Sequence, residues 1–207
     1  MVVATAWFAI AAWAGDIDQP KLVVHVVDYA NLSAATLQGA GVQAELLFHE
    51  AGVDSDWPVC SIAQQTAPCH TPVGESDLFV RILAASPSAG NNLGKAYWPE
   101  GGKTGVYASV YYNQVRDAVR RGFGYPNQLL AVIMAHEAAH LLGLEHAARG
   151  IMHSRLSGAE LRDAGTSHLL FSKAQSAFLR ASVAAHLAAH TAKGSGVRVT
   201  ADVRPVK

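Results

Sequence analysis

The chain has 207 residues, half of them hydrophobic and only 15% charged, which is enough apolar material for one globular core and excludes a largely disordered protein. Its 16 Lys and Arg balance its 16 Asp and Glu, so the formal net charge is zero. This balance is atypical of nucleic-acid-binding proteins, which carry a basic surface. We therefore expect no nucleic-acid partner and no stable membrane insertion, and we expect a monomer.

Residues 1–14 form an apolar segment that ends in the small-residue triplet Ala12–Trp13–Ala14. Such a segment is typical of a secretory signal and is too short to span a bilayer. It predicts a secreted or periplasmic protein. The alternative is a buried N-terminal element, because the basic residues that usually begin a signal are missing. At the other end, residues 192–207 are expected to form a flexible tail.

In the first half of the chain, the Val-rich segment 21–30 predicts a strand buried on both faces. Residues 33–48 predict a helix with Ser33 as its N-cap, and two further strands are expected at 57–61 and 77–84. Residues 86–105 are rich in Gly, Asn, Ser and Pro. They predict a long surface loop, with one short strand possible at 94–98.

In the second half, aromatic and β-branched residues predict a strand at 106–115, followed by a short helical segment at 116–122. Pro126 suits the first turn of a helix that runs to Gly143 and is apolar nearly all round, so it belongs at the centre of the protein. A loop is expected over 144–160, and a last helix over 172–190.

Cys60 and Cys69 flank a polar loop. In an exported chain such a pair is most simply a disulfide. The alternative is two buried free thiols. Neither residue belongs to a C-x-x-C pair, which argues against a zinc knuckle.

The segment HEAAHLLGLEH spans His136 to His146. On a helix, residues four apart share one face, so His136 and His140 can bind one ion. Gly143 can take the left-handed conformation that ends a helix, which would return His146 toward the same ion. Three neutral imidazoles leave a tetrahedral zinc ion one position for water, as in catalytic zinc sites.

Glu137 follows His136 but is rotated around the helix. It would lie too far round to be a fourth ligand and near enough to take a proton from the bound water. Zinc lowers the pKa of that water from about 15.7 to about 7, so a carboxylate suffices as the base and the site could hydrolyse amides. The alternative, core histidines without a metal, requires buried partners that an Ala- and Leu-rich segment does not supply.

The segment matches H-E-x-x-H-x-x-G-x-x-H, and Met152 follows within RGIMHSRL. Over about residues 126–155 the chain therefore resembles the metzincin zinc metalloproteases. The resemblance implies a single α+β catalytic domain, expected here over 15–191. It would contain a twisted mixed sheet, an active-site helix, a Met-turn with Met152 as a hydrophobic floor, and a C-terminal helix.

The resemblance also implies an edge strand that aligns extended peptides by β-augmentation, and we place it at Lys95, Ala96, Tyr97 and Trp98. A simple hydrophobic anchor is the alternative for these residues. Ala147 after the third histidine, and His153 and Ser154 after the methionine, match no common subfamily, so the subfamily stays open. His153 is either an auxiliary donor to the developing oxyanion or an exposed turn residue.

The sequence thus predicts a zinc-dependent endopeptidase with peptide or protein substrates, in which His136, His140 and His146 bind Zn²⁺ and Glu137 is the general base. The alternatives are a non-catalytic module stabilised by zinc and a zinc hydrolase of a non-peptide amide. His186 and His190 repeat the spacing of four but lack both the glutamate and a third histidine. We assign no metal to them.

Overall fold

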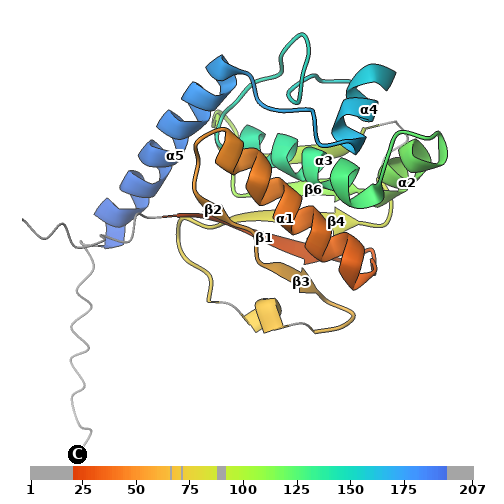
Figure 1. The fold of residues 1–207 in the computed structure, drawn as a ribbon. Coiled ribbons are helices and arrows are strands. Elements are labelled where there is room, and N and C mark those ends of the chain that lie inside the picture. Colours follow the sequence, from red (N-terminus) through yellow and green to blue (C-terminus); the bar gives the residue numbers. More distant parts are fainter. Residues whose placement is uncertain (1–20, 66, 71, 88–91, 195–207) are drawn as a thin grey trace, which may run out of the picture.

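The computed structural model describes residues 21–65, 67–70, 72–87 and 92–194. Within these ranges a six-stranded mixed sheet is accompanied by five α-helices (Figure 1). The expected leader at 1–14 and residues 195–207 of the expected tail lie outside the described residues. No helix within the described ranges combines the length and hydrophobicity needed to cross a membrane.

The sheet has the strand order β2-β1-β4-β6-β5, and β3 also pairs with β1. All pairings are parallel except that of β5 with β6, which is antiparallel. β5 therefore ends the sheet with one partner strand among the described residues. The strands are β1 (Leu22–Asp28), β2 (Ser55–Asp56), β3 (Val59–Ser61), β4 (Leu78–Leu83), β5 (Gly94–Tyr97) and β6 (Tyr107–Tyr111).

The helices are α1 (Ala34–Glu50), α2 (Tyr112–Arg120), α3 (Pro126–Leu141), α4 (Gly158–Gly165) and α5 (Lys173–Gly194). The side chain of Ser33 accepts a hydrogen bond from the Thr36 amide, so Ser33 is the N-cap of α1 as expected. Every residue of α3 from Leu129 to Leu141 is buried, because α1 packs on one side of it and strands β4, β5 and β6 lie on another. The apolar helix expected at the centre of the protein is therefore there.

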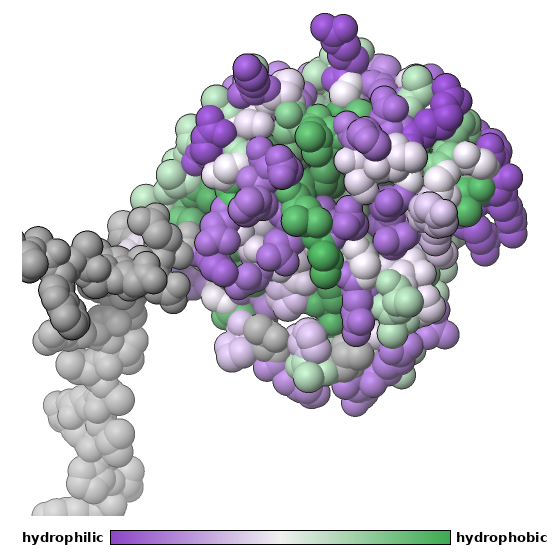
Figure 2. Space-filling view, in the orientation of Figure 1, coloured by the Kyte–Doolittle hydropathy of each residue, from purple (hydrophilic) through white to green (hydrophobic). Residues whose placement is uncertain are grey.

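Alternation of buried residues shows which face of the sheet is covered. In β4, Leu78, Val80 and Ile82 are buried, whereas the residues that alternate with them, Phe79, Arg81 and Leu83, are half-buried. Figure 1 shows α1 and α3 lying in front of the sheet. The outer surface on this side is not uniformly polar, because Val42 and Leu46 of α1 are exposed, and Figure 2 shows a narrow hydrophobic band running down this face between hydrophilic residues.

Four expectations about the elements are wrong. The strand expected at 106–115 ends at Tyr111, because Val115 and Ala118 pack into the core from a helix. The loop expected over 144–160 gives way to α4 at Gly158, where Ser157 and Glu160 form a capping box. The last helix runs to Gly194, into the expected tail. β1 is not buried on both faces, since Val23 and Val27 are only half-buried.

Candidate metal centre

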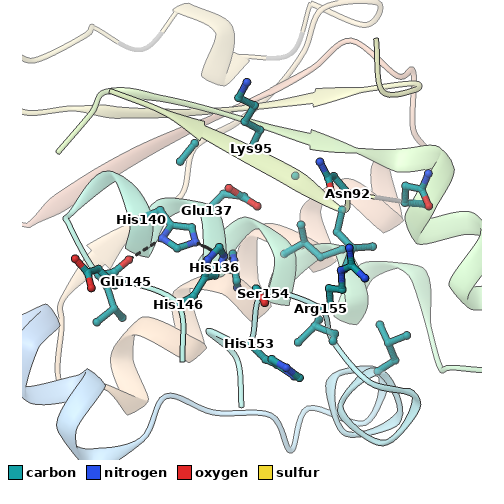
Figure 3. A pocket seen from close by; sticks show the side chains of 18 of the residues that line it. Asn92, Lys95, His136, Glu137, His140, Glu145, His146, His153, Ser154 and Arg155 are labelled. Atoms are coloured by element: carbon teal, nitrogen blue, oxygen red, sulfur yellow. Dashed lines mark hydrogen bonds between the residues drawn. The ribbon is translucent and has the colours of Figure 1, made fainter. Parts of the chain in front are cut away.

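Three histidine side chains converge at one point beside α3 (Figure 3). Nε2 of His140 lies 3.0 Å from Nε2 of His136 and 3.1 Å from Nε2 of His146, and one ligand atom from each ring lies within 4.8 Å of the others. His136 and His140 are buried, and His146 is exposed. The structure thus brings together the three residues that the sequence predicts as ligands.

Backbone carbonyls fix the protonation of the two buried rings. Nδ1 of His136 lies 2.6 Å from the Ile151 carbonyl oxygen, and Nδ1 of His140 lies 2.6 Å from that of Leu144. A carbonyl oxygen only accepts hydrogen bonds, so each Nδ1 must carry the proton and donate it. Each Nε2 therefore carries a lone pair and faces the shared point.

This arrangement fits a metal ion. Two Nε2 lone pairs 3.0 Å apart repel one another unless a cation or proton lies between them. Tetrahedral zinc with Zn–N distances of 2.0–2.1 Å would place its nitrogen ligands about 3.3 Å apart, close to the separations found here. Hydrogen bonds from the second ring nitrogen to a carbonyl are the usual support of metal-bound histidines.

Burial keeps these imidazoles neutral, which is the form that binds metal. In the metal-free protein, burial lowers the pKa of His136 to about 4, helped by the neighbouring His140 and His146 and opposed by the hydrogen bond to Ile151. Burial also lowers the pKa of His140. Both rings are therefore ready to act as ligands near neutral pH.

Gly143 ends α3 in the left-handed conformation expected of it, with φ of 88°. Its amide donates to the His140 carbonyl, and the Leu144 amide donates to the Ala139 carbonyl. These two bonds form a Schellman motif. The turn places the Leu144 carbonyl against His140 and carries the chain back toward His146.

Met152 is buried in the core, in a turn that contacts two of the three histidine segments. The residue before it, Ile151, supplies the carbonyl that holds His136. The carbonyl of Met152 itself accepts a hydrogen bond from the amide of Ala147, one residue after His146. The segment that resembles a Met-turn therefore supports the triad through its backbone.

The carboxylate of Glu137 is buried beside β5 and accepts a hydrogen bond from the Ala96 amide. Burial raises its pKa to about 8 in the metal-free protein, and the Ala96 hydrogen bond partly offsets this. Figure 3 shows it pointing away from the point where the imidazoles meet, toward β5. Glu137 thus does not join the group of ligands.

Several solved structures resemble this one, and two of them are the following. The fold is similar to that of a zinc-dependent peptidase. That protein, from Methanocorpusculum labreanum, aligns with a TM-score of 0.51 and 13% sequence identity over 77% of this chain and 99% of its own. Archaemetzincin from Methanopyrus kandleri aligns with a TM-score of 0.54 and 14% identity over 79% of this chain and 96% of its own. No protein-family model matches the sequence, and no curated protein sequence does either. The likeness and the His triad together support Zn²⁺, the cofactor expected from the sequence.

The triad opens into a cleft of about 1530 Å³ whose walls include β5 and the segment after Met152. Lys95, Ala96 and Trp98 line this cleft, but Tyr97 does not. The Tyr97 ring lies instead near Arg81 and the ammonium group of Lys95. Figure 3 shows the Lys95 side chain extending away from the histidines.

His153 also lines the cleft, yet its Nδ1 lies 2.7 Å from a carboxylate oxygen of Glu160. That carboxylate accepts from the Gly150 and Ser157 amides as well. Burial would raise the pKa of Glu160, but the hydrogen bonds from His153, Ser157 and Gly150 outweigh it and lower the pKa to about 2. His153 is therefore a half-buried turn residue whose Nδ1 is engaged by Glu160. Together with Glu160 it helps to fix the loop over residues 150–157, which contains Ile151.

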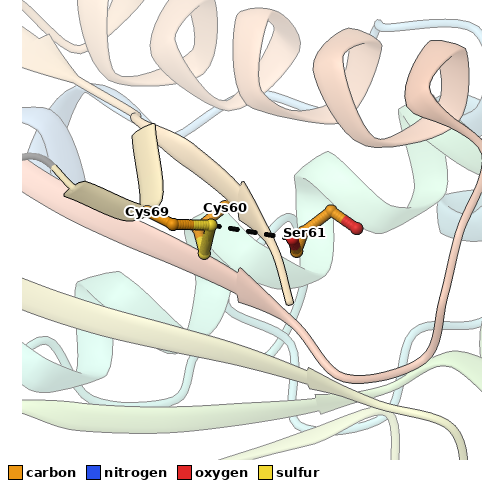
Figure 4. Close-up of a disulfide and its surroundings, with 3 residues drawn as sticks. All are labelled: Cys60, Ser61 and Cys69. Carbon is orange, nitrogen blue, oxygen red and sulfur yellow. Dashed lines mark hydrogen bonds between the residues drawn. A yellow bond between two sulfur atoms is a disulfide. The ribbon is translucent and has the colours of Figure 1, made fainter. Parts of the chain in front are cut away.

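The remaining residues singled out by the sequence lie away from the cleft. Cys60 in β3 and Cys69 in a short 3₁₀ helix (Ala67–His70) form the expected disulfide (Figure 4). Nε2 of His186 lies 2.8 Å from the Ser76 carbonyl oxygen. Among the described residues the only cluster of three or more potential metal ligands is the triad of α3 and its turn.

Sequence reasoning missed Gly94. A Cβ at this position would lie 2.5 Å from Oε1 of Glu137 and less than 3 Å from its Cγ and Cδ. The glycine therefore leaves the space that the carboxylate occupies. No local sequence pattern marks it, since the two residues come together only when β5 lies against α3.

Replacing Gly143 should weaken zinc binding according to how well the new residue tolerates positive φ. Valine is disfavoured there, so Gly143→Val should distort the turn that carries Leu144 and His146. We expect a 10- to 100-fold rise in the zinc Kd, the usual effect of disturbing the partners of metal ligands. Gly143→Asn is the matched control because asparagine adopts this conformation more readily. Titration against a competing chelator measures both, and equal zinc affinities for the two variants would contradict the role of the turn.

Proposed function

We propose that this protein is a zinc-dependent endopeptidase of metzincin type, with His136, His140 and His146 as the zinc ligands and Glu137 as the general base. The observation that carries the proposal is the meeting of three Nε2 atoms in an open cleft, with a buried carboxylate on the same helix turn. When bound there, zinc supplies Lewis acidity, which favours ionisation of a water molecule and polarises a carbonyl group.

Glu137 then performs two proton transfers. Its carboxylate takes a proton from the attacking water, whose oxygen forms a bond to the carbonyl carbon of the substrate. It next delivers that proton to the amide nitrogen, so the C–N bond breaks and a neutral amine leaves. The Ala96 amide donates to Glu137 and so limits its orientations during both transfers.

The wall of the cleft suits an extended peptide. β5 pairs with β6 along one edge, and its other edge has no partner strand among the described residues. An extended substrate could add to that edge by β-augmentation. Trp98, which is 50% exposed and lines the cleft, offers an apolar surface at the end of this strand.

Two features favour this proposal over its alternatives. The cleft of about 1530 Å³ exceeds the 300–1,000 Å³ of typical small-molecule pockets, which favours a polypeptide over a small amide. A structural zinc site is usually closed by four protein ligands, whereas three side chains converge in the described part of this chain.

The disulfide further leads us to propose export to an oxidising compartment, where such bonds persist.

Replacing Glu137 should abolish hydrolysis without releasing zinc. For Glu137→Gln we expect kcat on a cleavable peptide to fall by about 10²- to 10⁴-fold, the range for loss of a general base. Zinc content should stay at one per chain because the ligands are untouched. Glu50→Gln, the same change at the exposed end of α1, is the control. Full activity in the zinc-loaded Glu137→Gln protein would rule out the assigned base.

Replacing Gly94 should slow catalysis by displacing the base. The added methyl group of Gly94→Ala overlaps the Glu137 carboxylate, so we expect kcat to fall by about 100-fold, as for a misplacement of about 1 Å. Zinc affinity should not change. Gly158→Ala, at another glycine of the cleft, meets its nearest neighbour at an ordinary 3.5 Å and serves as the control. If both variants kept wild-type kcat, close packing of Gly94 on Glu137 would have no catalytic role.

A further inference from the structure

The two ends of the cleft differ in charge. Figure 3 shows Glu145 on one side of the triad and Arg155 on the other. Arg120 and Arg121, at the end of α2, also line the cleft. Arg121 lies over the ring of Phe123, which packs against Gly158, three residues after Arg155. We call the three arginines the arginine end of the cleft. Because the whole chain has a formal net charge of zero, this cluster is a local feature and not a consequence of a basic protein.

Two of these guanidinium groups lack a carboxylate partner. Asp117 lines the same wall, but its carboxylate pairs with Arg120 at 3.4 Å. No carboxylate oxygen of the described residues lies within 4 Å of the side chains of Arg121 or Arg155. Two of the three guanidinium groups of the arginine end thus have no ion-pair partner within 4 Å among the described residues.

Arg121 is held in place on the cleft wall. Its Nε donates to the Asp117 carbonyl oxygen at 3.2 Å, and its guanidinium lies 5.4 Å from the centre of the Phe123 ring. These contacts leave its terminal nitrogens free to donate, and they reduce the entropy lost when a ligand binds. Arg155 comes from the loop after Met152, and Figure 3 shows its guanidinium directed across the pocket toward Asn92.

Apolar side chains also line the cleft, beside polar ones. Ile133 and Leu161 are buried, and Phe123 and Leu156 are partly buried and pack on the core. A ligand that fits this end therefore has an aliphatic stem and an anionic tip. Guanidinium groups recognise carboxylates through paired N–H donors, and the arginine end of the cleft offers such donors.

We propose that the arginine end binds a carboxylate of the peptide substrate, so that the enzyme selects peptides with a negative charge close to the scissile bond. The carboxylate belongs either to an acidic side chain or to a free C-terminus. The inference rests on the proposed function, because it assigns a substrate class to the same cleft. Arg121 and Arg155 are the residues that determine the selection.

Binding by the zinc-loaded Glu137→Gln protein tests the inference apart from catalysis. The probes are fluorescein-labelled peptides of one neutral sequence, with Glu or Gln placed in turn at each of the positions flanking the scissile bond. A further pair ends in a carboxylate or an amide. Fluorescence anisotropy then gives the ratio of Kd values within each pair, and the pair with the largest ratio identifies the source of the carboxylate.

We expect at least one acidic peptide to bind about tenfold more tightly than its neutral counterpart at low salt, and less so at high salt. The ratio should approach one in the Arg121→Met, Arg155→Met double variant. It should persist in Arg116→Met, which loses the same charge from an exposed position of α2 outside the cleft. Equal binding of acidic and neutral peptides, no binding of either, or a ratio that survives the double variant would overturn the inference.

Hydrolysis of the same peptides by the wild-type protein separates the two claims. Cleavage without any preference for acidic peptides overturns the carboxylate site and leaves the endopeptidase proposal intact. Selective binding of acidic peptides with no cleavage by the zinc-loaded wild type supports the carboxylate site and contradicts the endopeptidase proposal.

Discussion

The site depends on two hydrogen bonds from imidazole to backbone. The carbonyls of Ile151 and Leu144 hold the Nδ1 protons of His136 and His140, so both Nε2 lone pairs point into the same small volume. Lone pairs this close are unfavourable without a positive charge between them. The folded chain therefore holds two lone pairs in a repulsive arrangement that a bound divalent ion would relieve. The surrounding segments keep the two imidazole rings in that arrangement.

The rest of the fold keeps those two carbonyls in place. Burial of α3 between α1 and the sheet fixes the helix that carries the first two histidines. The left-handed turn at Gly143 sets the position of the Leu144 carbonyl. The Glu160 carboxylate holds the loop that bears Ile151, because it accepts hydrogen bonds from the Gly150 amide before Ile151 and from the Ser157 amide after it. Gly143, Leu144 and the residues after Met152, which line the cleft, thus belong to the same segments that orient the histidines.

Much of this could be predicted from the sequence, because it depends on local spacing. The helical period places His136 and His140 on one face, and the glycine three residues later predicts the turn that returns His146. The aromatic residues of 106–115 misled the assignment, since strand preference continues past Tyr111 while core packing by Val115 requires a helix. The capping box of Ser157 and Glu160 was a local signal for α4 that could have been read.

Features that join distant segments were beyond the sequence. The partner of His136 is a carbonyl 15 residues away, and carbonyls are present at every position, so no residue type marks it. The fit of Gly94 against Glu137 and the arginine end likewise depend on how β5, α2 and the loop after Met152 meet α3. They follow from tertiary packing and not from any pattern of spacing.

The central claim, that one ion is held by three imidazoles with a fourth position left to solvent, is tested most directly by X-ray absorption at the zinc edge of the purified, zinc-loaded protein. We predict one zinc per chain with three nitrogen ligands of imidazole type at about 2.0–2.1 Å and one oxygen ligand. A shell containing sulfur, a fourth imidazole, or no stoichiometric zinc would contradict this account.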